Sequence, residues 1–297
     1  MTFDREKAKA WFQASRPPFF IATLVPLTIG WILAAHKGTW HTWRFLLVVL
    51  GSLMVHLATN MANDYFDHLQ GTDAGESIGG SRVIQEGKIS PKALIRAIVL
   101  SYCFASLIAS YLLITLNLWA MLPILLLALF SSIFYVAPPI RYGYHGLGEL
   151  FVGINMGPIM VVCTYWVILE RPDWKPLYLS LPIGLMVAAI LYYQSLPDIK
   201  TDAAAGKNTL AVLLGKKHAF EVFVLLWGTI YLSILVLVIS GLLSWFAFAS
   251  FATVPIFIRL LGIIKRTQDW VNLDQYGNYV RMLYFFNGLV IVISLLL

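Results

Sequence analysis

Two groups of acidic and amide side chains interrupt an otherwise apolar sequence. The first group is Asn60, Asn63, Asp64 and Asp67. These positions follow the i, i+3, i+4, i+7 spacing, so all four side chains would share one face of a continuous helix. The second group, Asp198 and Asp202, is spaced at i and i+4 and would also share a face. The sequence therefore predicts two short stripes of oxygen ligands.

Oxygen ligands of this kind are suited to a divalent cation bound together with phosphate groups. Magnesium prefers six oxygen ligands and usually takes one or two protein carboxylates plus oxygens of a substrate phosphate. If the two stripes lie on the same side of the molecule, they can converge on Mg2+ and a diphosphate. We expect Asn63, Asp67, Asp198 and Asp202 to be the metal ligands, and Asp64 to join them in the catalytic site.

Composition places both stripes in a membrane protein. The 297 residues are 59% hydrophobic and only 12% charged, with a mean hydropathy of +0.77. A spanning helix needs about 20 mostly apolar residues, and we expect an all-α fold with nine such helices. They are predicted near residues 18–36, 45–62, 95–116, 119–137, 147–169, 177–196, 219–240, 243–262 and 280–297.

The spans also predict the domain organisation. The second and sixth run in the same direction and each ends in an acidic group, and the sixth lies four spans after the second. This pattern predicts a single transmembrane domain over 1–297, built as a pseudo-repeat of helices 1–4 and 5–8 plus a ninth helix.

The distribution of basic residues predicts the orientation. With the N-terminus inside, all but four of the 21 Lys and Arg residues fall on the cytoplasmic side, the four being Lys37, Arg44, Arg171 and Lys175. Cytoplasmic loops are enriched in Lys and Arg, so both acidic groups are expected at the cytoplasmic face of the cell (inner) membrane. The net charge of +6 then reflects topology and contact with anionic membrane lipids, and no nucleic-acid partner is expected.

Several basic residues near the acidic stripes are candidates for contact with a diphosphate. They are Arg82, Lys88, Arg141, Lys200 and Lys207. Lys200 lies two residues from both Asp198 and Asp202, so on a regular helix it would point away from their face. Arg82 and Arg141 are therefore preferred over Lys200.

The two motifs resemble those of the UbiA superfamily of intramembrane prenyltransferases. That family has an Asn-Asp-x-x-Asp motif after helix 2 and an Asp-x-x-x-Asp motif after helix 6, which match Asn63-Asp64-Tyr-Phe-Asp67 and Asp198-Ile-Lys-Thr-Asp202. The resemblance covers the whole chain and implies nine helices around a central cavity open to lipid.

One branch of that superfamily is more similar than the others. Gly71-Thr-Asp73 and the segment 79–85 look like the 1,4-dihydroxy-2-naphthoate polyprenyltransferases of menaquinone biosynthesis, and Asp73 is carried over as a substrate-binding residue. This chain departs from that branch at Gln194-Ser195-Leu196-Pro197, where Asn-Asn and an Arg are usual. The departure concerns the acceptor and leaves the diphosphate site unaffected.

The resemblance implies transfer of a polyprenyl group from a polyprenyl diphosphate to a small aromatic acceptor. Mg2+ would neutralise the leaving diphosphate, and the allylic cation would attack an electron-rich ring carbon. Tyr135, Tyr192 and Tyr193 are candidates to shield that cation with their aromatic faces.

Two alternatives remain open from the sequence. A UbiA-type enzyme could use another acceptor, such as a chlorin, haem or a glycerol-phosphate lipid, as the departure at Gln194 and Ser195 allows. A cation-coupled secondary transporter would also contain repeats and acidic sites, but its sites usually lie near the midplane of the membrane.

Overall fold

The computed structural model describes residues 5–72 and 79–297, and within that part of the chain the regular elements are all helices. The elements in order are α1 (Arg5–Ser15), η1 (Pro17–Phe19), α2 (Ile21–Ala35), α3 (Thr42–Gln70), α4 (Pro91–Thr115), η2 (Trp119–Met121), α5 (Leu122–Phe134), η3 (Tyr142–His145), α6 (Gly148–Ile154), η4 (Asn155–Ile159), α7 (Met160–Leu169), α8 (Lys175–Ser195), α9 (Ile199–Ala204), α10 (Leu210–Ile239), η5 (Trp245–Thr253), α11 (Val254–Arg266), η6 (Trp270–Tyr276) and α12 (Gly277–Leu296). The predicted all-α class is confirmed.

Among the described residues, seven helices are long and apolar enough to span a membrane, or eight if the bent pair 5–19 and 21–35 is one span. The predicted number of nine is therefore not confirmed. The two weak spans are α2, with 15 residues, and α5, with 13. At 1.5 Å per residue both are about 20 Å long, which is less than the hydrocarbon core of roughly 30 Å. Pro17 and Pro18 precede α2, and Pro123 lies in the first turn of α5, positions at which proline favours the start of a helix.

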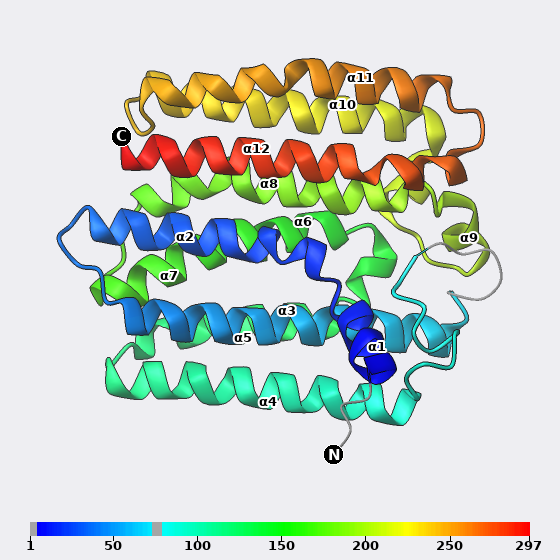
Figure 1. Ribbon diagram of the computed structural model, residues 1–297, viewed down its shortest axis with the longest axis horizontal. Helices are drawn as coiled ribbons and strands as arrows, with labels where there is room; N and C mark the ends of the chain where they lie inside the picture. Colours follow the sequence, from blue (N-terminus) through cyan, green and yellow to red (C-terminus); the bar gives the residue numbers. More distant parts are fainter. Residues whose placement is uncertain (1–4, 73–78) are drawn as a thin grey trace.

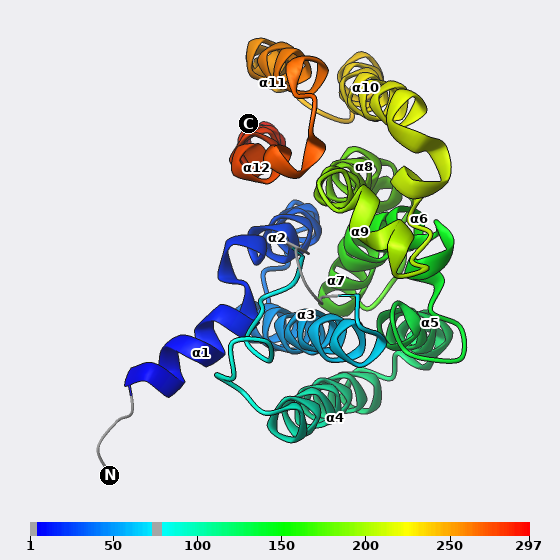
Figure 2. The same cartoon turned by 90° about the vertical axis from the view of Figure 1, so that its right-hand side faces the viewer.

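The long helices lie side by side along one axis (Figure 1) and form a curved bundle when viewed along that axis (Figure 2). Helix α8 lies near the middle and packs against α10, α6 and α12. The largest buried cluster joins α2, α7, α8, α10 and α12, and a second joins α1, α3, α4 and the segment 79–90. The end of the bundle at which α3 finishes and α9 lies, on the right in Figure 1, is called the polar end below.

Helix α1 lies outside the bundle and ends against the polar end (Figure 2). Arg16 follows it in a left-handed conformation, with φ 51°, and Pro17 and Pro18 then start the turn into α2. Gln13 fixes α1 to segment 79–90, since its side-chain amide nitrogen, Nε2, donates to the Ser81 carbonyl at 2.7 Å. The Lys88 ammonium donates back to Gln13 Oε1 at 2.8 Å. Helix α1 therefore holds segment 79–90 beside the polar end.

The span over residues 148–169 contains a local widening. Helices α6 and α7 are joined by the π-helical turn η4, which contains Pro158. Proline has no backbone N–H to donate, and a π turn accommodates that loss. At the same level Gly157 contacts Gly184 of α8 so closely that a Cβ on Gly157 would lie 2.5 Å from Gly184 Cα. The two glycines let α6–α7 and α8 approach while Asn155 turns toward the interior.

Candidate active site

The first acidic stripe is carried beyond the membrane by the length of α3. Its 29 residues extend about 44 Å, whereas the hydrocarbon core is about 30 Å thick. The helix ends at Gly71, whose φ of 73° is left-handed, and the Thr72 N–H donates to the Asp67 carbonyl at 3.0 Å. A glycine in this conformation is a common helix stop. Asn63 and Asp67 therefore lie in the last two turns of α3, at the polar end.

The second acidic stripe lies on the short helix α9. Asp198 is its N-cap residue, and the Asp202 N–H donates to the Asp198 carbonyl at 2.8 Å. The chain then reverses through Gly206, with φ 72°, and the Lys207 N–H donates to the Asp202 carbonyl at 2.8 Å. This tight return places the Lys207 side chain beside the carboxylates.

The two stripes meet around Lys207. Its ammonium lies 3.3 Å from Asp67 Oδ2 and 3.6 Å from Asp202 Oδ1. Asn63, Asp67, Asp198 and Asp202 all line one cavity of about 440 Å3, which we call the polar cavity. Within the described residues no three Asp, Glu, His or Cys side chains gather around one point. The geometry is thus one of paired carboxylates facing each other across a cation.

Burial and neighbouring charges together raise the pKa values of Asp202 and Lys207. Burial raises the pKa of Asp202 to about 7, although the Lys207 charge acts in the opposite direction. Burial alone would lower the pKa of Lys207, but the carboxylates of Asp67 and Asp202 raise it overall. Lys207 is therefore a fixed positive charge at the centre of the cluster.

Tyr144 holds the other oxygen of Asp67. Its hydroxyl donates to Asp67 Oδ1 and also lies 3.0 Å from the Thr72 hydroxyl. The Lys207 ammonium lies 5.4 Å from the centre of the Tyr144 ring. Burial, followed by the Asp67 charge, raises the pKa of Tyr144, so Tyr144 stays a neutral donor that orients Asp67.

Asp64 faces away from the cluster. It accepts hydrogen bonds from the Ser81 N–H at 2.9 Å and from the Ser81 hydroxyl, and it is ion-paired with Arg16. It does not line the polar cavity. One helical step of 100° separates it from Asn63, which accounts for the different direction. Asp64 fixes Arg16 and segment 79–90 to α3.

Of the five basic residues singled out from the sequence, Lys207 lines the polar cavity, whereas Arg82, Lys88, Arg141 and Lys200 do not. Arg141 Nη1 donates to Gln70 Oε1 at 2.7 Å, and Lys88 pairs with Glu86 at 2.6 Å. Lys200 pairs with Asp269 at 3.0 Å on the surface, in agreement with its expected direction. Arg82 has a positive φ of 60° in segment 79–90.

Of the predicted tyrosines, Tyr135 lines the polar cavity and the apolar cavity described below. Tyr193 also lines the polar cavity, and its hydroxyl donates to the Leu273 carbonyl at 2.8 Å. Tyr192 is fully buried and donates to the Ala219 carbonyl of α10 at 2.9 Å, so it packs in the core. Asp73 lies outside the described residues.

Among the residues that the structure describes, three cationic side chains line the polar cavity: Arg16, Lys207 and Arg281. Sequence reasoning noted Lys207 as a nearby cation but did not select it, and it did not consider Arg16 or Arg281 for the site. The Gly206-Lys207 turn directly after the second motif was an available signal for Lys207. Arg281 comes from α12, and no local pattern connects it to either motif.

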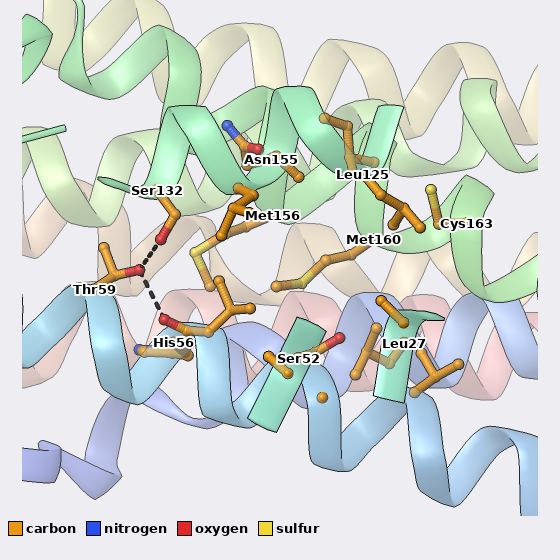
Figure 3. Close-up of a pocket in the computed structure, with 18 of the residues that line it drawn as sticks. Leu27, Ser52, His56, Thr59, Leu125, Ser132, Asn155, Met156, Met160 and Cys163 are labelled. Atoms are coloured by element: carbon orange, nitrogen blue, oxygen red, sulfur yellow. Dashed lines mark hydrogen bonds between the residues drawn. The ribbon is translucent and has the colours of Figure 1, made fainter. Parts of the chain in front are cut away.

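A second, mostly apolar cavity of about 430 Å3 adjoins the polar cavity. Its wall is formed by residues such as Leu125, Met156, Met160 and Cys163 on one side and Ser52, His56 and Thr59 of α3 on the other (Figure 3). It follows α3 from Asn63 back to Leu47, a distance of about 24 Å at 1.5 Å per residue. We call it the apolar cavity.

The two cavities share part of their walls. The shared residues are Arg16, Phe19, Asn63, Tyr135, Ile190, Leu191 and Gln194. A ligand with a charged head and a long apolar tail can therefore occupy both, with the head at the carboxylates and the tail along α3. Gln194, where the sequence departs from the menaquinone branch, lies at this junction.

Comparison with known proteins identifies the family to which this arrangement belongs. The model of the UbiA prenyltransferase family matches residues 23–272. The chain belongs to the UbiA prenyltransferase family. The resemblance inferred from the two motifs is thereby confirmed, and this UbiA family member is an integral, multi-pass membrane protein.

Individual relatives cover most of this UbiA family member. A 1,4-dihydroxy-2-naphthoate octaprenyltransferase of Bacillus subtilis is 31% identical over 245 residues, 82% of this chain and 78% of the relative. A 2-carboxy-1,4-naphthoquinone phytyltransferase of Synechocystis is 27% identical, covering 95% of this chain and 91% of the relative. A UbiA homolog from Archaeoglobus fulgidus bound to GPP and Mg2+ has a TM-score of 0.58 at 14% identity, covering 95% of this chain and 99% of that one.

Proposed function

We propose that this UbiA family member transfers a polyprenyl group from a polyprenyl diphosphate to 1,4-dihydroxy-2-naphthoate, a step of menaquinone biosynthesis. The observation that carries the proposal is the junction of the polar cavity, which holds the paired carboxylates, with a long apolar cavity. Relatives named as naphthoate prenyltransferases support the choice of acceptor.

The donor set fits Mg2+ bound together with a diphosphate. Asp67 and Asp202 already face one cation, the Lys207 ammonium, and Asn63 and Asp198 line the same cavity. Since the carboxylates are paired and do not form a larger cluster in the described residues, substrate oxygens would complete the metal coordination. A structure of a distant homolog with GPP and Mg2+ supports this reading. When bound, Mg2+ would neutralise the diphosphate as it leaves.

The protein side chains have separate tasks in this proposal. Lys207 adds a fixed positive charge beside the leaving group, and Tyr144 keeps Asp67 oriented toward the cavity. Tyr135 lies at the junction of the two cavities, where the allylic carbon of the donor would lie. Its aromatic face can stabilise positive charge on that carbon.

The acceptor and the orientation belong to the same proposal. The polar end, which contains the active site, lies on the cytoplasmic side of the cell (inner) membrane, as the distribution of basic residues predicts. Gln194 at the junction leaves room for another acceptor, such as a chlorin, haem or a glycerol-phosphate lipid. A transporter is disfavoured because the acidic groups lie at one end of the bundle and not at its midplane.

Enzyme assays in detergent test the proposal. Purified protein should release diphosphate from a polyprenyl diphosphate and form prenylated naphthol only when Mg2+ and 1,4-dihydroxy-2-naphthoate are present. Asp67→Ala and Asp202→Ala should each lower kcat/KM by at least about 100-fold, because each removes a charged ligand from a buried site.

Asp269→Asn is the matched control, since it removes an exposed carboxylate at the polar end that pairs with the exposed Lys200. It should retain wild-type turnover. Turnover by Asp67→Ala equal to that of Asp269→Asn would refute the assignment of the site. Product with another acceptor but none with the naphthoate would assign a different acceptor to the same chemistry.

A further inference from the structure

The polar cavity has a wall that the diphosphate chemistry leaves unused. This wall is formed by Pro18 and Phe19 of η1 and by Gly277, Val280 and Arg281 of α12. The two segments come from opposite ends of the chain, and α2 and α12 pack side by side (Figure 2). The acidic motifs lie on α3 and α9, so this wall is built from other elements.

The charges in the polar cavity distinguish Arg281 from the other two cations. Lys207 is held between Asp67 and Asp202. Arg16 is ion-paired with Asp64, and both side chains are largely buried. In the part of the chain that the structure describes, Arg281 has no ion pair, and its guanidinium donates only to the side-chain oxygen of Asn278.

The surroundings of Arg281 suit a planar aromatic anion. Its guanidinium carbon lies 5.6 Å from the centre of the Phe19 ring. Phe19 lines both cavities, so its ring lies at the junction where transfer would occur. An aromatic ring can stack against Phe19, and a carboxylate can accept two parallel hydrogen bonds from a guanidinium.

We propose that Arg281 binds the carboxylate of the aromatic acceptor and makes the enzyme selective for acceptors that carry a ring carboxylate. The inference rests on the proposed function, in which the acceptor is a naphthoate. It adds a specificity-determining residue outside the two acidic motifs. Arg281 acts on acceptor binding and leaves diphosphate binding to the aspartates and Lys207.

A pair of acceptors tests this role directly. The pair is 1,4-dihydroxy-2-naphthoate and its carboxylate-free analogue 1,4-dihydroxynaphthalene. Arg281→Gln should raise the KM for the naphthoate by about 10- to 100-fold, the range for a charge-assisted hydrogen bond. The KM for the prenyl diphosphate should stay the same, as should kcat/KM for the analogue. Arg281→Lys should restore part of the naphthoate affinity because it retains the charge.

Arg259→Gln is the matched control. Arg259 also lies over an aromatic ring, at 5.6 Å from the centre of Tyr279, but it does not line the polar cavity. It should leave both KM values at the wild-type level. Melting temperatures of the three variants identify any general loss of folding, and Arg281→Lys keeps the test valid if Arg281→Gln is unstable.

Binding measured without the prenyl donor separates this inference from the proposed function. The intrinsic fluorescence of the naphthoate is titrated with wild-type protein and with each variant. A dissociation constant that rises in Arg281→Gln and partly recovers in Arg281→Lys supports the inference, even if no prenyl transfer occurs and the proposed function fails. Equal dissociation constants for wild type and Arg281→Gln would overturn the inference, as would a wild-type protein that does not bind the naphthoate.

Discussion

Replacing Lys207 with Gln tests whether the two acidic stripes repel each other without a cation between them. The Lys207 side chain is 16% exposed, and the Asp67 and Asp202 side chains are 3% and 6% exposed. Removal of one partner from a buried ion pair costs about 3–5 kcal/mol, because the remaining charges stay buried without compensation. Lys207→Gln should therefore destabilise the metal-free protein by about that amount.

Lys200→Gln provides a control with the same chemical change. Lys200 pairs with Asp269 at 3.0 Å, but the two side chains are 63% and 53% exposed. Exposed pairs contribute only about 0–1 kcal/mol. The two variants thus separate the effect of burial from the effect of losing one lysine at the polar end.

Thermal unfolding in detergent with EDTA, followed by tryptophan fluorescence, measures the difference. For a chain of this size 1 kcal/mol corresponds to roughly 2–4 °C. Lys207→Gln should lower the melting temperature by roughly 6–20 °C, and Lys200→Gln by less than roughly 4 °C. Under the proposed function, added Mg2+ should stabilise Lys207→Gln more than wild type, because in the variant no ammonium offsets the charges of the two carboxylates that would hold the metal. Equal melting temperatures for the two variants would refute the converging arrangement of Asp67 and Asp202.

Three further predictions follow from burial and packing. Because the pKa of Asp202 is raised from 3.8 to about 7, the folded protein binds a proton in this window that the unfolded chain releases. Metal-free stability should therefore fall as pH rises toward 7, and a pH series of melting temperatures should lose this slope in Asp202→Asn. Gly157→Ala should destabilise by about 1–3 kcal/mol because its Cβ would lie 2.5 Å from the Gly184 backbone. Gly228→Ala, with open space around the position, should be neutral or stabilising by up to about 1 kcal/mol in the same melting assay. Gly51→Leu should place a side chain in the apolar cavity and lower kcat/KM for long prenyl donors more than for a ten-carbon donor; an unchanged ratio would contradict a tail path along α3.

Helical periodicity explains what could be predicted about the site. The i, i+4 spacing placed Asn63 with Asp67 and Asp198 with Asp202, and each pair faces the polar cavity. The prediction also grouped Asp64 with these residues. Asp64 is one helical step of 100° from Asn63, and it faces Ser81 instead of the cavity. Lys200 was expected to point away from the cluster, and its contact with Asp269 agrees.

Contacts between distant segments account for the site residues that the sequence did not predict. Arg16, which precedes η1, and Arg281 of α12 line the polar cavity together with residues of α3 and α9, and nothing in their local sequence marks this position. Nine apolar segments were expected, whereas among the described residues the segments around α2 and α5 form short helices. Hydropathy measures how apolar a segment is, but prolines and turns decide how much of it becomes one continuous helix.

The shared wall of the two cavities has a consequence for product release. Under the proposed function the donor is held at one end by its diphosphate, which contacts the aspartates and Lys207, and at the other by an apolar tail. After transfer the tail belongs to the product, while the diphosphate leaves separately into water. The remaining apolar walls resemble the lipid interior in polarity, so the tail gains little by staying. Transfer thereby removes the diphosphate that anchored the chain, so that only the contacts of the acceptor ring, such as Arg281 at its carboxylate, delay passage of the prenylated product into the bilayer.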